Sequence, residues 1–117
     1  MENTFVASPL SFQLTEEQLA VQAAARDFAR TELLPGVIDR DEHQVFPKDQ
    51  IRKMGELGLM GMMVSEQYGG GGMDTVSYVL AMEEISKIDA SASVCMSVNN
   101  SLVCWGLENF GTEAQKQ

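Results

Sequence analysis

The 117-residue sequence is poor in basic side chains and has no long apolar run. It contains 8 Lys and Arg against 17 Asp and Glu, so its formal net charge is −9. Nucleic acids and anionic membrane surfaces are bound by clustered cations, and this balance argues against both as partners. No segment approaches the ~20 uninterrupted apolar residues of a membrane span. Residues 1–14 lack a basic start followed by a continuous apolar run, so they do not resemble a signal peptide.

Cysteine and histidine are scarce as well. Cys95 and Cys104 lie nine residues apart on one predicted helix, which places their backbones ~13 Å apart and beyond disulfide reach. Free thiols on a buried helix are typical of a reducing compartment, so we expect a cytoplasmic protein. The only histidine, His43, stands in the polar segment 41–44. There we interpret it as a solvated loop residue in preference to a metal ligand or a catalytic base.

Full charges are absent from Ser91 to Phe110, except at Glu108. A helix that is apolar or small on all sides belongs inside a bundle, so we predict that this helix is covered by neighbours. Its one polar interruption is Asn-Asn-Ser at 99–101. An unpaired buried amide costs about 1–3 kcal/mol. Either other helices satisfy these side chains, or they face a cavity where a ligand or another domain lies.

The rest of the chain alternates helical periodicity with start and stop signals, and predicts an all-α bundle of about four helices. The first helix begins at a capping box formed by Thr15 and Gln18. It ends near Pro35, which cannot donate a backbone hydrogen bond. The second helix begins with Pro47 at its first position and ends at Gly58, in a Schellman arrangement that brings the next residue back onto the helix.

The segments between these helices predict loops. Residues 1–13 show no period and predict an extended arm, while Leu59–Val64 predicts a buried irregular connector. We interpret Gly69–Gly72 as a tight passage, because a phosphate-binding loop would follow a strand and precede a Lys-Ser/Thr pair. Asp74 is the expected N-cap of a third helix, and its apolar residues up to Ile88 predict packing on two sides.

This third helix carries the adjacent carboxylates Glu83 and Glu84. Neighbouring residues on a helix point ~100° apart, so the two cannot share a proton or one substrate atom. We interpret Glu83 and Lys87 as a surface ion pair at i,i+4. On the first helix, Arg26 and Arg30 are expected to face water.

The last residues announce a further helix. Gly111 is expected to end the charge-poor helix as a C′ residue, and Thr112 with Gln115 forms a second capping box. The sequence stops at Gln117, although a single isolated turn of helix is not stable. We therefore expect the chain to be part of a longer protein.

Three segments carry a resemblance to a known family: Leu14-Thr-Glu-Glu-Gln-Leu19, Ser65-Glu-Gln-Tyr-Gly-Gly70, and Ser97-Val-Asn-Asn-Ser-Leu102 followed by Phe110-Gly-Thr-Glu-Ala-Gln-Lys-Gln117. In this order, on an all-helical pattern, they resemble the N-terminal helical domain of acyl-CoA dehydrogenases, and most closely the short-chain or butyryl-CoA type. The resemblance covers residues 14–117. It departs at Ser65, where the family usually has Pro, and this change is expected to loosen the turn without touching the chemistry.

The resemblance implies an enzyme with this helical domain, a middle β-domain and a C-terminal helical bundle, assembled as a tetramer with FAD between the last two domains. It implies that a Glu removes the α-proton of the acyl-CoA while a hydride leaves the β-carbon for the flavin. Electrons then pass to an electron-transfer flavoprotein. The base, the flavin contacts and most CoA contacts are implied to follow Gln117. We therefore assign no catalytic, cofactor-binding or metal-binding residue, and we expect the chain alone to be inactive, to bind no FAD and to self-associate.

By the same resemblance, the charge-poor helix borders the acyl chain of the substrate. Cys95, Val98 and Leu102 are spaced i, i+3, i+7 and are expected to share one apolar face, which would form one wall of the acyl pocket. Plain helix–helix packing explains this stripe as well, and the spacing does not decide between the two. The polar residues 99–101 would then face partner helices or the adjoining β-domain.

Three functional hypotheses remain open. The leading one is the N-terminal domain of a flavin-dependent acyl-CoA dehydrogenase for short acyl chains. The second is a free-standing helical interaction module without enzymatic activity, which would bind a partner helix through an apolar groove. The third is a family relative that acts on another acyl thioester. The interrupted cap at Thr112 favours the first over the second.

Overall fold

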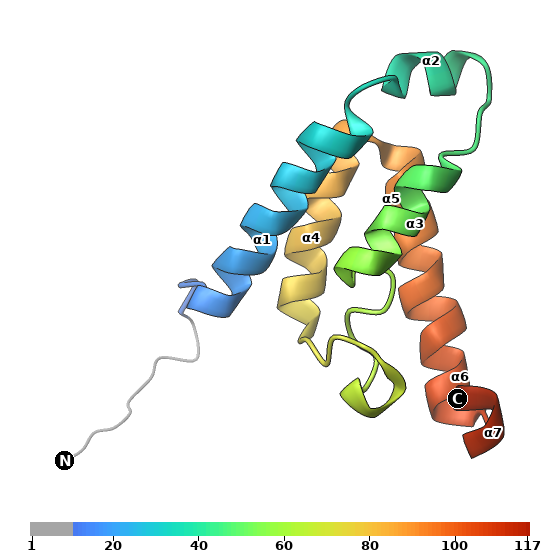
Figure 1. The fold of residues 1–117 in the computed structure, drawn as a ribbon. Coiled ribbons are helices and arrows are strands. Elements are labelled where there is room, and N and C mark those ends of the chain that lie inside the picture. The colour runs from blue at the N-terminus through green and yellow to red at the C-terminus, as the bar shows by residue number, and fades with distance from the viewer. Residues whose placement is uncertain (1–10) are drawn as a thin grey trace.

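A computed structural model describes residues 11–117, and these residues form helices joined by turns and loops, with no strand among them (Figure 1). The longer helices are α1 (Glu16–Phe28), α3 (Lys48–Leu57), α4 (Thr75–Ile88) and α5 (Ala90–Val98). The shorter ones are α2 (Val37–Glu42), α6 (Trp105–Phe110) and α7 (Glu113–Lys116). The predicted all-α class is confirmed, and most of the arm predicted at residues 1–13 lies outside the described residues.

The capping box predicted at the start of α1 is confirmed. Thr15 Oγ1 accepts from the backbone N–H of Gln18 at 3.1 Å, and Gln18 Oε1 accepts from the backbone N–H of Thr15 at 3.0 Å. The helix ends in a wide π turn, η1 (Ala29–Leu33), where the Leu34 N–H donates to the Ala29 carbonyl at 2.8 Å. Pro35 follows, and because it has no N–H, the helix cannot continue regularly through it.

The chain then turns through a left-handed glycine into α2, which extends to Glu42. Of the polar segment 41–44, interpreted as a loop, Asp41 and Glu42 are helical, and His43 follows directly after the helix. Pro47 caps α3 from outside the helix and does not occupy its first position. The Schellman ending of α3 is present, since Gly58 has φ +93° and the Leu59 N–H donates to the Met54 carbonyl at 2.9 Å.

The irregular connector Leu59–Val64 and the glycine tract Gly69–Gly72 pack against each other. The Gly71 N–H donates to the Gly61 carbonyl at 3.0 Å, and the Gly72 N–H donates to the Val64 carbonyl at 2.8 Å. At Gly70, a Cβ atom would lie 2.2 Å from the Val64 carbonyl oxygen, so only glycine fits. The glycines therefore serve a tight passage, as predicted, around the short 3₁₀ turn η2 (Glu66–Tyr68).

Helix α4 lies at the centre of the bundle. Asp74 caps it by accepting from the Ser77 N–H at 2.7 Å, as predicted. The helix packs against α1 on one side and α5 on the other (Figure 1). The buried residues Ala25, Ala81 and Ala92 are small and allow these helices to approach closely. The core around them also includes Phe28, Leu33, Met54, Met62, Ile85 and Met96.

The charge-poor segment forms one continuous rod made of α5, a wide π turn named η3 (Asn99–Cys104), and α6. It starts one residue earlier than predicted, after the N-cap Asp89. Gly111 ends it with extended backbone (φ −79°), so the left-handed C′ conformation is wrong. Glycine is required there because a Cβ atom would lie 2.5 Å from the Leu107 carbonyl oxygen. The capping box of Thr112 and Gln115 is confirmed at the start of α7.

Candidate functional site

The polar residues of the rod are satisfied inside this chain. Asn100 is 3% exposed, and its Oδ1 accepts from the Met62 N–H at 2.8 Å. Its Nδ2 donates to the carbonyls of Leu59 and Met96, both at 2.9 Å. Asn99 Nδ2 donates to the Met60 carbonyl at 2.6 Å. For Asn99 and Asn100 the expected partners in an adjoining β-domain are therefore wrong. Three of these four bonds join the connector Leu59–Val64, and the fourth goes to Met96 on the rod itself.

Ser101 differs from its two neighbours. Its hydroxyl is on the exposed side of the rod and donates to the Ser97 carbonyl at 2.7 Å, one turn back on the same helix. The polar segment therefore has an anchored part, Asn99 and Asn100, and a solvated part. Only the anchored part links the rod to the connector.

Away from this contact, the rod leaves several apolar side chains open to solvent. We name them together the wall face and define it by Val94, Val98, Leu102, Val103, Trp105, Leu107 and Phe110, whose exposed fractions run from 42% to 80%. The prediction that neighbours cover this helix holds for its other side only, where Ala92, Ser93 and Met96 are buried. Monomeric proteins rarely expose large contiguous apolar patches, so a face of this kind indicates contact with another surface or a ligand.

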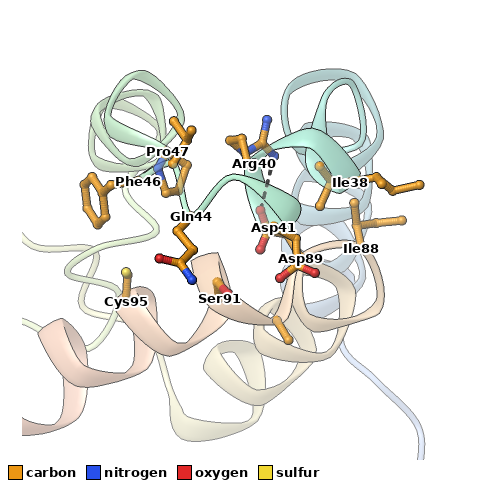
Figure 2. Close-up of a pocket in the computed structure, with 13 residues that line it drawn as sticks. Ile38, Arg40, Asp41, Gln44, Phe46, Pro47, Ile88, Asp89, Ser91 and Cys95 are labelled. Carbon is orange, nitrogen blue, oxygen red and sulfur yellow. Dashed lines mark hydrogen bonds and ion pairs between the residues drawn. The ribbon is translucent and has the colours of Figure 1, made fainter.

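The three residues proposed as a pocket wall are not in one environment. Val98 is 42% exposed and Leu102 is 67% exposed, both on the wall face. Cys95 is half-buried and lines a different hollow, of about 630 Å³, between α2 and the start of α5 (Figure 2). Figure 2 shows Gln44 pointing from the α2–α3 segment toward the start of α5. Gln44 holds φ +56°, a left-handed conformation that is uncommon for a residue other than glycine.

The hollow does not fit a dinucleotide such as FAD. Its wall includes one cation, Arg40. The Arg40 guanidinium donates to the Pro35 carbonyl at 3.0 Å, to the Leu33 carbonyl at 2.7 Å and to the Asp89 carboxylate at 3.2 Å. Its charge is thus already paired and is not offered to a pyrophosphate. We derive no chemical step through a flavin in this chain.

The glycine tract also offers no phosphate site. The N–H groups of Gly69, Gly70, Gly71 and Gly72 all donate to carbonyls within the described chain. A phosphate-binding loop needs backbone N–H groups that point at the ligand. These groups are used by the passage itself.

The Glu84 carboxylate is buried and paired, and it serves to hold the fold together. Glu84 has a side chain 5% exposed, and it accepts from Arg26 at 3.0 and 3.3 Å and from Lys87 at 2.9 Å. These hydrogen bonds, first from Arg26 and then from Lys87, lower the pKa of Glu84 from 4.5 to about 2. The predicted Glu83–Lys87 pair is wrong, as is the expectation that Arg26 simply faces water, because packing of α1 on α4 brings Arg26 to Glu84. An ionised carboxylate held in this way joins two helices and is not available as a general base.

Two further hydrogen bonds tie the C-terminal end of the rod and the helix after it to the turn η2. The Ser65 N–H donates to the Glu108 carboxylate at 2.9 Å, a bond that proline at this position could not make. The departure from the family pattern therefore adds a link between η2 and α6. Tyr68 donates to Glu113 of α7 at 2.8 Å, which ties the last helix to the same turn.

The Cys104 thiol is not activated. Cys95 and Cys104 are both free. Burial, and secondarily the charge of Glu108, raises the pKa of the Cys104 thiol, so it stays protonated and poorly nucleophilic. Across residues 11–117, no three His, Cys, Asp or Glu side chains gather to hold a metal ion. No helix in this part of the chain has the length and apolar character to cross a membrane.

The described residues thus form a helical bundle with a closed core, exposed apolar side chains on the rod and a buried carboxylate paired between two helices. Residues 15–117 match the family model described as acyl-CoA dehydrogenase, N-terminal domain. The chain belongs to this family.

Curated acyl-CoA dehydrogenases are similar to this chain in sequence. The chain is 48% identical over 107 residues to the short-chain specific acyl-CoA dehydrogenase, mitochondrial, of Bos taurus, which covers 92% of this chain and 26% of the relative. It is 41% identical over 108 residues to the short-chain specific acyl-CoA dehydrogenase of Clostridium acetobutylicum, covering 92% and 28%. The chain thus spans about a quarter of the length of these curated relatives.

Two solved structures share the fold. Butyryl-CoA dehydrogenase from Megasphaera elsdenii aligns with a TM-score of 0.83 at 38% identity, over 92% of this chain and 29% of that one. A chain of the structure described as the electron transferring flavoprotein of Acidaminococcus fermentans aligns with a TM-score of 0.88 at 42% identity, over 92% and 28%. At these identities the likeness includes both fold and sequence.

Proposed function

We propose that this chain is the N-terminal helical domain of a flavin-dependent acyl-CoA dehydrogenase that forms the α,β double bond of a short-chain acyl-CoA. The observation that carries the proposal is the wall face: the chain closes its own core, yet leaves a charge-free helix side open. A fatty chain needs an apolar, water-free wall of this kind. The short-chain relatives support the substrate class.

The part assigned to this chain is to shape the acyl pocket. Val98 and Leu102 would border the acyl chain from the wall face, with Cys95 beside them nearer the hollow. A larger side chain at these positions shortens the space for the substrate, and a smaller one lengthens it. One methylene in an apolar pocket contributes about 1–3 kcal/mol to discrimination between substrates, so these few residues suffice to select chain length.

FAD belongs to the proposal as the hydride acceptor of the whole enzyme, with no flavin-holding or catalytic residue assigned to this chain. The proposed partners are the acyl-CoA substrate and an electron-transfer flavoprotein. The second is supported by the similar chain in the structure described as such a flavoprotein. We further propose that the whole enzyme is a homo-oligomer, as a tetramer, and that the 117-residue chain self-associates through the wall face.

The proposal is tested in the whole enzyme by anaerobic mixing with butyryl-CoA. We expect the flavin absorbance to bleach with that substrate, and the 117-residue chain alone to bind no stoichiometric flavin. A flavin spectrum from the chain alone, or a whole enzyme that leaves acyl-CoA unchanged, would contradict it. Sedimentation of the chain at high concentration tests self-association, and a monomer there would remove that part.

Val98→Ala in the whole enzyme tests the pocket wall. We expect longer acyl-CoA substrates to gain in kcat/KM relative to butyryl-CoA, because the pocket deepens. Val79→Ala is the matched control, since Val79 is similarly exposed, at 48%, but lies on α4. If both variants keep the wild-type preference, Val98 does not line the pocket.

An interaction module without activity is the second candidate. It is favoured by the exposure of Trp105 at 54% and Phe110 at 80%, which would suit a groove for a partner helix. An active flavoenzyme containing this domain excludes it as the main function.

A further inference from the structure

We propose that Asn100 is a positioning residue that sets acyl-chain selectivity by holding the wide turn η3, and so the direction of Leu102 relative to Val98. The inference rests on the proposed function. Three features lie at the same point of the rod: the buried amide of Asn100, the π turn η3, and the step from Val98 to Leu102 on the wall face.

The wide turn lies inside the wall. It spans Asn99–Cys104, so Val98 immediately precedes it and Leu102 lies within it. A π turn carries more residues than an α turn, and π turns are rare and concentrated at functional sites. One added residue rotates everything that follows by about 100° relative to an uninterrupted helix. The direction of the second half of the wall face therefore depends on whether this turn is wide or regular.

The two asparagines explain why the turn is wide. Consecutive residues of a regular α-helix point ~100° apart, yet Asn99 and Asn100 both reach the same connector. Asn99 bonds the Met60 carbonyl at 2.6 Å, while Asn100 bonds the Leu59 carbonyl at 2.9 Å and the Met62 N–H at 2.8 Å. A wider turn brings neighbouring side chains closer in direction, so both can bond at once.

The connector is a firm anchor for these bonds. Its backbone is also held by the glycine tract and the residue after it, since the Gly71 N–H donates to the Gly61 carbonyl at 3.0 Å and the Met73 N–H to the Met62 carbonyl at 2.8 Å. Leu59 and Met62 are themselves buried in the core. Asn100 thus transmits the position of a fixed segment to a helix whose other side faces the proposed substrate.

The test is the ratio of kcat/KM for hexanoyl-CoA to that for butyryl-CoA in the flavin-loaded whole enzyme. Asn100→Ala removes the three bonds of Asn100 and leaves that of Asn99, and Asn100→Ser is too short to reach the connector but can still bond the Met96 carbonyl. Asn99→Ala is milder, because it loses only the bond to Met60 and the weak contact with the Cys104 thiol. We expect the ratio to change by about fivefold or more in the Asn100 variants, and by less in the same direction in Asn99→Ala.

Two controls separate positioning from general damage. Ser101→Ala alters the same turn but removes only the exposed bond to the Ser97 carbonyl. Ile85→Val weakens the buried core away from the wall. Both are expected to keep the ratio within about twofold of wild type, even where overall activity falls.

The outcomes are distinct. An unchanged ratio in the Asn100 variants that retain flavin overturns the inference and leaves the proposed function standing. If neither Asn100 variant folds, Asn99→Ala decides, and an unchanged ratio there overturns the inference too. A wild-type enzyme inactive on both thioesters refutes the proposed function, and the inference falls with it.

Discussion

The α1–α4 pair and the rod of α5, η3 and α6 place their side chains in opposite ways. The pair buries a charged group, since the Glu84 side chain is 5% exposed between Arg26 and Lys87. The rod has almost no charge, yet it leaves Trp105 54% and Phe110 80% exposed. At these positions the burial of a side chain therefore follows the neighbour that packing supplies and not the polarity of the residue.

This difference suggests that one set of side chains stabilises the fold and another set serves the proposed function. Side chains between α1, α4 and the inner side of the rod hold the fold together, and their loss should unfold the chain. Side chains on the wall face contribute little to this chain, because water already reaches them. Their effect should appear only where another surface or an acyl chain covers them. The predictions below test that division, from the largest expected effect to the smallest.

The largest contrast is between the core and the wall face. Ile85 is fully buried, so Ile85→Ala should lower the free energy of unfolding by about 2–5 kcal/mol through lost burial and a new cavity. Val94 is 60% exposed, and Val94→Ala should change it by no more than about 0.5 kcal/mol. Urea unfolding of the 117-residue chain, diluted until it is monomeric, measures both, and similar losses at the two positions would contradict the division.

The connector should be the next most sensitive element. Gly70→Ala places a Cβ atom 2.2 Å from the Val64 carbonyl oxygen. The passage must then shift, and we expect a loss of about 1–3 kcal/mol in the same unfolding experiment. A variant as stable as wild type would mean that the glycine tract does not press against the connector.

The Glu84 pair should make stability depend on acid. The folded-state pKa of Glu84 is lowered from 4.5 to about 2, so its contribution is complete above pH 4.5 and is lost as the pH falls toward 2. Glu84→Gln should cost about 1–2 kcal/mol at pH 7, since its partner Arg26 is partly solvated. The difference in the free energy of unfolding between the wild type and Glu84→Gln should shrink as the pH falls below 4.5 and disappear toward pH 2. Glu83→Gln, at the exposed neighbouring position, is the control, and the same pH dependence there would rule out the Glu84 pair as the cause.

The smallest expected effect is a gain in stability, at Gly106. Gly106 lies inside α6 on the open rod, and nothing is within 4 Å of the position its Cβ atom would take. Gly106→Ala should stabilise the chain by about 0.5–1 kcal/mol, because alanine loses less backbone entropy in a helix. Thermal unfolding measures the gain. Destabilisation of the isolated chain would show that this part of the rod is already covered.

Local signals predicted the helix ends well. The capping boxes at Thr15 and Thr112 and the Schellman ending at Gly58 are all present, since each depends on residues within a few positions of one another. Interactions between distant residues were missed. Asn100 meets Leu59 across 41 positions, and Arg26 meets Glu84 across 58. The need of Asn100 for partners was visible in the sequence, but the identity of those partners was not.

By itself the sequence determined the all-α class and where most helices begin and end, because capping, proline and periodicity act over one or two turns. The scarcity of charge in the rod was also visible in the sequence. Only the tertiary structure decided which side of the rod is covered and that its asparagines bond the connector inside this chain. It also decided that a carboxylate is buried between α1 and α4. These outcomes depend on which segments pack together, and packing joins residues that no local pattern relates.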